Sequence, residues 1–168
     1  MTKLVDSNHP ALYTIAEEVA DEEFRDGTIQ KILKDLRQGL TSYNVEGFVS
    51  VAIAAPQIGI SKRVFIIEDQ STGKDRDRLP SIVAINPQLK KISKKTHLVE
   101  EGCLSLPNLY GTVRRATNVT LTALDENGQL FERGAGGLLA QIIQHEYDHL
   151  DGILFTDRAE EVWELVKK

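Results

Sequence analysis

Apolar residues recur every three or four positions between residues 28 and 43, with lysines, arginines and other polar residues between them. The apolar positions are Ile29, Ile32, Leu33, Leu36 and Leu40. This spacing gathers the apolar side chains on one face of a helix and leaves the opposite face to charged residues. We therefore expect an amphipathic helix over residues 28–43 that covers a hydrophobic core.

Four later segments have the short, β-branched apolar runs that are typical of strands. They are residues 48–55, 63–69, 81–93 and 112–132. Pro56 ends the first run because it has no amide hydrogen to donate, and Pro87 marks an irregularity in the third. Asn127-Gly128 is a strong signal for a β-hairpin in the last run. The polar residues 71–80 predict a loop between strands.

The end of the chain predicts two helices. The first starts near Gly137 and ends before Gly152, where a left-handed residue is expected to cap it. Residues 153–155 are a candidate short strand. Residues 157–168 predict a closing helix, because Asp157 suits an N-terminal cap and lysines end the segment.

The length of 168 residues predicts one domain over residues 1–168, with enough chain to bury a core. We expect an α+β fold of short antiparallel strands packed around a central helix, with N-terminal and C-terminal helices. The net charge of −5, without a basic stripe, disfavours direct nucleic-acid binding. No apolar run has the length of a signal peptide core or a membrane span, so we expect a cytoplasmic protein without membrane contact.

The segment QHEYDHLDG lies on the expected central helix and carries a candidate metal site. His145 and His149 stand four residues apart and continue the row of Leu138 and Ile142, so they face the core together. Glu146 is rotated by about 100° from His145, where it can handle a proton without binding the ion. This is the H-E-x-x-H arrangement of metal-dependent hydrolases. The alternative is a helix with two buried, hydrogen-bonded histidines and a surface glutamate.

Two histidines leave a tetrahedral metal ion short of a protein ligand. The chain contains no histidine or cysteine after His149, so a third ligand is expected from upstream. Cys103 is the candidate, because thiolate binds zinc and iron strongly; otherwise this single cysteine is a small core residue. Asp148 is either a solvated acid or an acceptor that orients an imidazole ring.

Three segments occur in a fixed order along the chain: AIAAPQIG, EGCLS and QHEYDHLDG. Together they resemble the motifs of the peptide deformylase family, G-x-G-x-A-A-P-Q, E-G-C-L-S and Q-H-E-x-D-H. The resemblance extends over nearly the whole chain. It implies a hydrolase that removes the formyl group from the N-terminal formyl-methionine of nascent polypeptides, a step of N-terminal methionine processing in protein biosynthesis.

The resemblance also implies the roles of individual residues. One divalent metal ion, Fe²⁺ with Zn²⁺, Ni²⁺ or Co²⁺ as substitutes, would be bound by Cys103, His145 and His149. Glu146 would handle protons, while Gln57 and the backbone amide of Leu104 would face the substrate carbonyl. Glu101 and Arg115 would pair behind the metal loop. The residues that would contact the substrate peptide are Val51, Ala52, Ile53 and Gly102.

The first segment departs from the family pattern, because Ser50 and Ala52 stand where the motif has glycines. A β-carbon at residue 52 would crowd a substrate backbone that lies along this strand. Gln141, one turn before His145, is placed to touch the pocket for the first side chain. These departures concern substrate preference rather than the metal site.

Three alternatives to a deformylase fit part of the sequence. A metallopeptidase that cleaves peptide bonds would share the helix motif but would not explain EGCLS. A catalytically weak, deformylase-like peptide-binding protein is suggested by Ser50 and Ala52. A structural zinc module would need a fourth protein ligand. We expect a monomer whose partners are formylated N-termini, and such a role would allow transient association with the ribosome.

Overall fold

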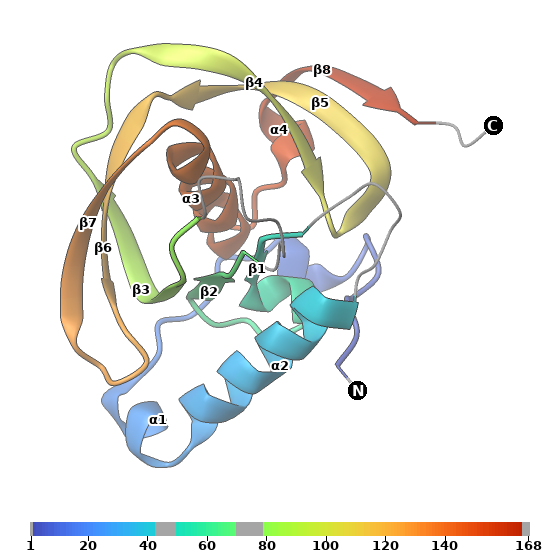
Figure 1. Ribbon diagram of the computed structural model, residues 1–168. Coiled ribbons are helices and arrows are strands. Elements are labelled where there is room, and N and C mark those ends of the chain that lie inside the picture. Colours follow the sequence, from blue (N-terminus) through green and yellow to red (C-terminus); the bar gives the residue numbers. More distant parts are fainter. Residues whose placement is uncertain (1, 43–49, 70–78, 166–168) are drawn as a thin grey trace.

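The computed structural model describes residues 2–42, 50–69 and 79–165, which form two antiparallel sheets around a central helix (Figure 1). The first sheet has the order β1-β2-β3-β6-β7. Its strands are β1 (Ala52–Ala54), β2 (Val64–Ile67), β3 (Ile82–Lys90), β6 (Asn118–Leu124) and β7 (Leu130–Gly136). The second sheet has the order β4-β5-β8, with strands β4 (Thr96–Cys103), β5 (Leu106–Ala116) and β8 (Ala159–Glu164).

The described part of the chain has four α-helices, and α2 and α3 lie on opposite faces of the first sheet (Figure 1). They are α1 (Asp21–Arg25), α2 (Thr28–Ser42), α3 (Gly137–Leu150) and α4 (Phe155–Arg158), with 3₁₀ turns η1 (Pro10–Leu12) and η2 (Ala55–Ile58). The amphipathic helix predicted from the apolar spacing is α2, and all five predicted positions are buried on it. Residue 43 lies outside the described residues.

Strand β1 divides the core into two clusters because successive side chains point to opposite faces. Ala52 and Ala54 pack in the cluster that includes α3, whereas Ile53 packs in the cluster that includes α2. The predicted first strand is therefore confirmed in its central part, and residues 48–49 lie outside the described residues.

The predicted irregularity and the predicted hairpin are both confirmed. The register between β3 and β6 shifts between Ile85 and Gln88, around Pro87. Strands β6 and β7 pair antiparallel through a turn in which Gly128 has φ of 76°. Most of the predicted loop over residues 71–80 lies outside the described residues.

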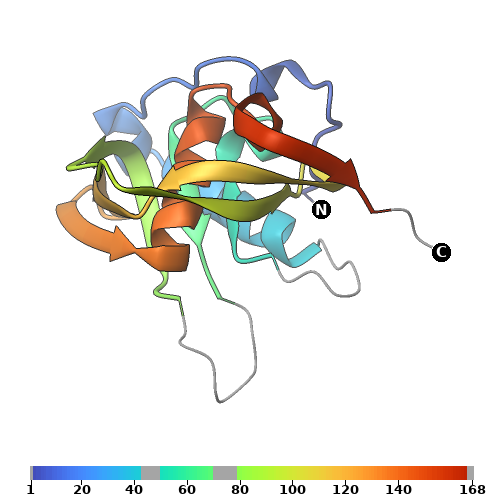
Figure 2. The ribbon, with the colours of Figure 1, turned by 90° about the horizontal axis from the view of Figure 1, so that it is seen from above.

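The predicted C-terminal helix is wrong. Residues 155–158 form the single turn α4, and the chain then continues as β8 beside β5 (Figure 2). Asp157 is not the N-cap residue as predicted: it is the third residue of α4, and its carboxylate accepts a hydrogen bond from the amide of Leu154, the N-cap, at 2.9 Å. Gly111 on β5 permits the pairing, because a β-carbon there would lie 2.5 Å from the carbonyl oxygen of Glu161. Pairing with an open sheet edge outweighs the helical charge pattern.

The short strand predicted over residues 153–155 is also wrong. Ile153 and Leu154 have no regular structure, and Phe155 opens α4. Phe155 is 1% exposed and packs against Cys103 and Val113, so it belongs to a small core beneath the second sheet. No helix within the three described ranges is both long and apolar enough to cross a membrane.

Candidate active site

Helix α3 delivers two histidines to the interior of the protein. It starts at Gly137, directly after β7, and is capped by Gly152, whose φ is 70° as the sequence predicts. His149 is 1% exposed and the side chain of His145 is 12% exposed. Their ring centroids lie 5.0 Å apart at an interplanar angle of 76°, as expected for side chains one helical turn apart.

Strand β4 brings Cys103 to the same place. The register between β4 and β5 shifts between Gly102 and Cys103, so the strand ends in a tight turn that carries the cysteine. Its Sγ lies 3.3 Å from Nε2 of His149. One ligand atom from each of Cys103, His145 and His149 can be chosen so that all three lie within 4.8 Å of one another. The fold therefore places Cys103 of β4 beside two histidines of α3 that lie more than forty residues later in the sequence.

The surroundings of Cys103 favour its thiolate form. Burial opposes ionisation, but the charge of His149 and hydrogen bonds from His145 and His149 bring the pKa of the Cys103 thiol well below its usual value. The backbone amide of Ser105 and Nε2 of Gln57 also point at the sulfur, at 3.4 and 3.6 Å. A thiolate with two imidazoles is a donor set that suits a divalent transition ion.

Glu146 is buried beside this cluster. It is 4% exposed, and its Oε2 has no hydrogen-bond partner among the described residues. Burial raises the pKa of Glu146 to about 6. The alternative of a surface glutamate is therefore wrong. A buried carboxylate oxygen without a protein partner, next to three ligand atoms, fits a site that accommodates an ion and a reactant.

The pair of Glu101 and Arg115 lies behind the histidines. Arg115 donates to both carboxylate oxygens of Glu101, at 2.7 and 2.9 Å, and Nδ1 of His145 lies 2.9 Å from Oε2 of Glu101. The residue that orients an imidazole is therefore Glu101. Asp148 is buried, so the interpretation as a solvated acid is wrong, and it accepts hydrogen bonds from Arg115 and Arg158 rather than directly from an imidazole ring.

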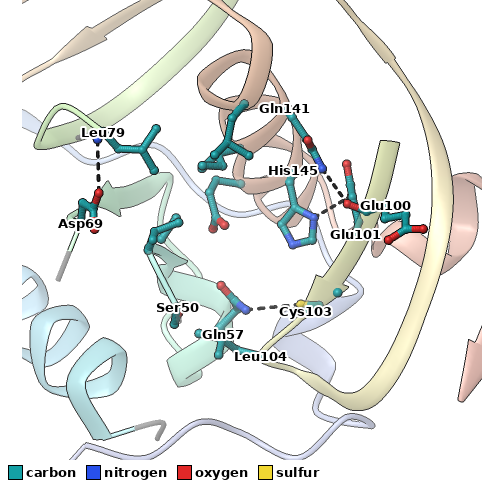
Figure 3. A pocket seen from close by; sticks show the side chains of 16 residues that line it. Ser50, Gln57, Asp69, Leu79, Glu100, Glu101, Cys103, Leu104, Gln141 and His145 are labelled. Carbon is teal, nitrogen blue, oxygen red and sulfur yellow. Dashed lines mark hydrogen bonds and ion pairs between the residues drawn. The ribbon is translucent and has the colours of Figure 1, made fainter. Parts of the chain in front are cut away.

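A cavity of about 370 Å³ opens at this cluster (Figure 3). The predicted site residues that line it are Val51, Ala52, Gln57, Gly102, Cys103, Leu104, His145 and Glu146. Ser50 and Gln141 line it as well, and Gln141 donates to the carbonyl of Glu100 at 2.9 Å. Leu138 also lies at this cavity and is 59% exposed, so its predicted place in the core is wrong.

Ile53 is the predicted substrate contact whose side chain the structure places elsewhere. Its side chain is fully buried against α2. A β-carbon added at Gly39 of this helix would lie 3.1 Å from the Cδ1 of Ile53. The alternation of side chains along β1 explains this, because Ala52 and Ile53 must point to opposite faces. Ile53 also pairs in register with Ile66 of β2, so its backbone N–H and C=O face that strand rather than the open edge.

Strand β1 is one of the two edge strands of the five-stranded sheet. The Glu68 amide donates to the Val51 carbonyl at 2.8 Å, so residues 51 and 68 form a hydrogen-bonded pair. Hydrogen bonding alternates along an antiparallel pair, which turns the N–H and C=O of Ala52 toward the open edge. An extended peptide could pair with this edge inside the cavity.

Sequence reasoning assigned no role to Ser105 and Arg158. Ser105 accepts a hydrogen bond from Nε2 of Gln57 at 3.1 Å and thereby fixes the direction of that amide. Its place in EGCLS was a signal that could have been used. Arg158 contacts Asp148 only because the chain forms α4 and β8, so the predicted closing helix concealed this contact.

Comparison with known proteins agrees with the predicted family. The sequence pattern of the family described as Polypeptide deformylase matches residues 1–164. A peptide deformylase of Treponema pallidum is 40% identical over 154 residues, which cover 90% of this chain and 84% of the relative. Peptide deformylase 1A, chloroplastic, of Solanum lycopersicum is 37% identical over 169 residues and 94% of this chain, which spans only 59% of that relative.

Solved structures agree with the fold. A class I type b peptide deformylase from Acinetobacter baumannii, bound to Met-Ala-Ser, superposes with a TM-score of 0.83 at 34% identity, covering 94% of this chain and 99% of that chain. Peptide deformylase from Thermotoga maritima gives a TM-score of 0.80 at 30% identity, with coverage of 96% and 99%. The predicted α+β class is confirmed, and the chain belongs to the polypeptide deformylase family.

Proposed function

We propose that this protein is a metal-dependent hydrolase that removes the formyl group from the N-terminal formyl-methionine of nascent polypeptides. The observation that carries the proposal is the cluster of Cys103, His145 and His149 beside the buried carboxylate of Glu146. Cys103, His145 and Glu146 line a cavity next to an open strand edge. Family membership supports the same reaction.

Cys103, His145 and His149 would hold one divalent ion, which when bound supplies a Lewis acid for hydrolysis at neutral pH. We propose Fe²⁺ as the ion, with Zn²⁺, Ni²⁺ or Co²⁺ as substitutes, since thiolate and imidazole ligands accept all four. The second imidazole nitrogen of His145 is occupied by Glu101, which leaves the other nitrogen to face the cluster.

Glu146 would carry the protons of the reaction. Its carboxylate accepts a proton from the attacking water, whose oxygen bonds to the formyl carbon. The bond between this carbon and the methionine nitrogen then breaks, and Glu146 returns the proton to the leaving amine. The products are formate and a peptide with a free N-terminus. A carboxyl group with a pKa raised to about 6 by burial is suited to both steps.

Gln57 and the amide of Leu104 would stabilise the negative charge that develops on the formyl oxygen. Oε1 of Gln57 accepts from the Ala54 amide at 2.9 Å, which directs Nε2 toward Cys103 and Ser105. Preorganised donors of this kind contribute roughly 3–4 kcal/mol each to transition-state binding.

The substrate peptide would extend along β1 and pair with the N–H and C=O of Ala52. The Acinetobacter baumannii structure with bound Met-Ala-Ser supports a ligand that begins with methionine. Val51 and Gly102 line the cavity and would contact the peptide, whereas the backbone of Ile53 is turned toward β2. Gln141 and Ile142 lie near His145 and would border the first side chain.

The cellular setting forms the wider part of the proposal. Formylated N-termini arise on the ribosome, so transient association with it is part of the proposal. A monomer in the cytoplasm remains our prediction, although the tomato relative is named as chloroplastic.

The test uses protein prepared without oxygen and loaded with Fe²⁺ or Ni²⁺, together with formyl-Met-Ala-Ser and, as the matched control, acetyl-Met-Ala-Ser. We expect formate and Met-Ala-Ser in equal amounts by mass spectrometry, and slow turnover of the acetylated peptide. Cleavage of the Met–Ala bond would identify a metallopeptidase. Peptide binding without formate release would identify a peptide-binding protein instead.

A further inference from the structure

We infer that Arg158 is a positioning residue for the metal centre, because it holds Asp148 and through it the side chains that orient His145. This inference rests on the metal site of the proposed function. It concerns a residue that would touch neither the ion nor the substrate.

Arg158 grips Asp148 with two hydrogen bonds. Its Nε lies 2.7 Å from Oδ2 and its Nη2 lies 2.9 Å from Oδ1 of that carboxylate. Parallel contacts of this kind fix the direction of both groups, and only the planar guanidinium provides them. Asp148 lies immediately before His149 on α3, so the paired hydrogen bonds also hold the last turn of the helix in place.

The contacts continue from Asp148 to the candidate metal ligand. Nη1 of Arg115 donates to Oδ2 of Asp148 at 2.7 Å, the same oxygen that Arg158 contacts. The remaining donors of Arg115 hold Glu101, which contacts Nδ1 of His145 at 2.9 Å. Every link is a direct hydrogen bond between charged or ionisable groups.

The balance of buried charges explains why Arg158 is needed beside Glu101, Arg115 and Asp148. The side chains of Glu101 and Asp148 are 3% and 8% exposed, and only Arg115, which is 4% exposed, lies between them. Two buried carboxylates require two cations, because an uncompensated buried charge is strongly unfavourable. Arg158 supplies the second cation from a half-exposed position, with 45% of its side chain accessible.

The C-terminal strand delivers Arg158 to this place. Arg158 is the last residue of α4, and the next residue, Ala159, begins β8 and pairs with Val113 on β5. Strand β5 also carries Arg115 two residues further on. Strand β8 runs beside β5 (Figure 2), and this pairing brings both arginines to Asp148.

The same two strands offer a matched control. Arg114 lies next to Arg115 on β5 and forms an ion pair with Glu160 of β8 at 2.9 Å, but their side chains are 51% and 46% exposed. Exposed pairs of this kind contribute little to stability. Arg114→Met removes a cation from the same sheet without touching the buried carboxylates.

The experiment measures how fast Co²⁺ leaves the protein into an excess of chelator, followed by the visible absorption of the bound ion. We expect Arg158→Met to release Co²⁺ about tenfold faster than wild type, at the lower end of the 10- to 100-fold effect of removing groups that orient ligands. Arg158→Lys keeps the charge but loses the paired contact, so its rate of Co²⁺ release should lie between those of wild type and Arg158→Met. Arg114→Met should match wild type.

The outcomes separate this inference from the proposed function. Failure of the wild-type protein to bind one Co²⁺ ion would contradict the proposed function itself. If wild type binds the ion and Arg158→Met releases it no faster than Arg114→Met, the positioning role is overturned. A lower melting temperature with unchanged release would mean that Arg158 is only structural. Should Arg158→Met fail to fold, the comparison of Arg158→Lys with Arg114→Met decides.

A second comparison tests whether Arg158 acts on the metal site through its contact with Asp148. Arg158→Met is introduced into protein that already carries Asp148→Asn, and the Co²⁺ release rates are compared. We expect the added substitution to change the rate little, because its partner carboxylate is gone. The same tenfold effect in both backgrounds would contradict a route through Asp148.

Discussion

Nδ1 of His145 lies 2.9 Å from Oε2 of Glu101, and the guanidinium of Arg115 holds the same carboxylate from behind. The carboxylate favours a proton on Nδ1 of His145 and so keeps Nε2 free to face the cysteine and the second histidine. Glu101 also precedes Cys103 by two residues on β4, so one buried pair supports two of the three candidate ligands.

Stability of the metal-free protein should depend on this pair at low pH. Burial alone would raise the pKa of Glu101, but hydrogen bonds from Arg115 and His145 lower this pKa from 4.5 to about 2. Because the pKa is lower in the folded state than in the unfolded state, ionised Glu101 stabilises the fold above about pH 4.5. This contribution to the free energy of unfolding, on the order of 3 kcal/mol, is lost as the pH falls toward about 2. Thermal melting across this range should show a steeper loss for wild type than for Glu101→Gln. Parallel curves would contradict the pairing.

Glu146→Gln should retain the metal ion and lose most turnover, because general acid–base catalysis contributes roughly 10²–10⁴-fold. The raised pKa of Glu146 means that its charged form is unfavourable in the folded protein at pH 7. The variant should therefore melt at the same or a higher temperature than wild type in the metal-free state. Formate release, metal content and melting temperature are measured on one preparation. Near-normal turnover with full metal content would remove Glu146 from the mechanism.

Ala52→Gly tests the departure in the first segment. Ala52 lies in β1 with a negative φ, so alanine should stabilise the fold by about 0.4–1 kcal/mol over glycine. Its β-carbon also borders the cavity where the peptide would pair. We expect a slightly lower melting temperature and a higher kcat/KM, mainly through KM, for formylated peptides longer than one residue.

The control for this substitution is Ala54→Gly, on the same strand and the same face but fully buried. It should lower the melting temperature without changing how kcat/KM depends on peptide length. If Ala52→Gly shows the same length dependence as wild type, the alanine at this position has no effect on substrate binding.

The iron form should lose activity in air faster than the nickel or zinc form. Fe²⁺ beside a thiolate and open to the cavity invites oxidation of the ion or of the Cys103 sulfur. Activity is followed over time under air and under nitrogen, and the mass of the protein reports oxidation of the sulfur. Equal lifetimes of all three forms under air would count against a cysteine ligand at an open site.

Much of the fold follows from local patterns in the sequence. The spacing of Ile29, Ile32 and Leu36 was sufficient for α2, and Asn127-Gly128 was sufficient for the hairpin. Strand β8 was missed because its glutamates, together with the lysines that follow it in the sequence, match a helix, while its real partner is the edge of a strand about fifty residues away. Pairing between distant segments leaves no signal in the periodicity of one segment.

The candidate site, like the fold, was predictable where it depends on one segment and unpredictable where it depends on contacts between distant segments. His145, Glu146 and His149 lie on one helix, so helical geometry alone placed them together. The contact of Cys103 with this helix is tertiary, so it could not be derived from spacing. Cys103 was proposed because two histidines leave a ligand missing, the family resemblance implied the same residue, and the structure places it beside the histidines. The partners of Asp148 could not be predicted, because they depend on how β5 and β8 pair around the end of α3.

The most direct test of the central claim is the metal content of Cys103→Ala. The protein and this variant are loaded with the same divalent ion without oxygen, passed through a desalting column and measured for ion per chain and for formate release from formyl-Met-Ala-Ser. We predict one tightly bound ion per chain and rapid formate release for wild type, and loss of both for Cys103→Ala with its fold intact by circular dichroism. Full retention of the ion by Cys103→Ala would contradict the proposed metal centre.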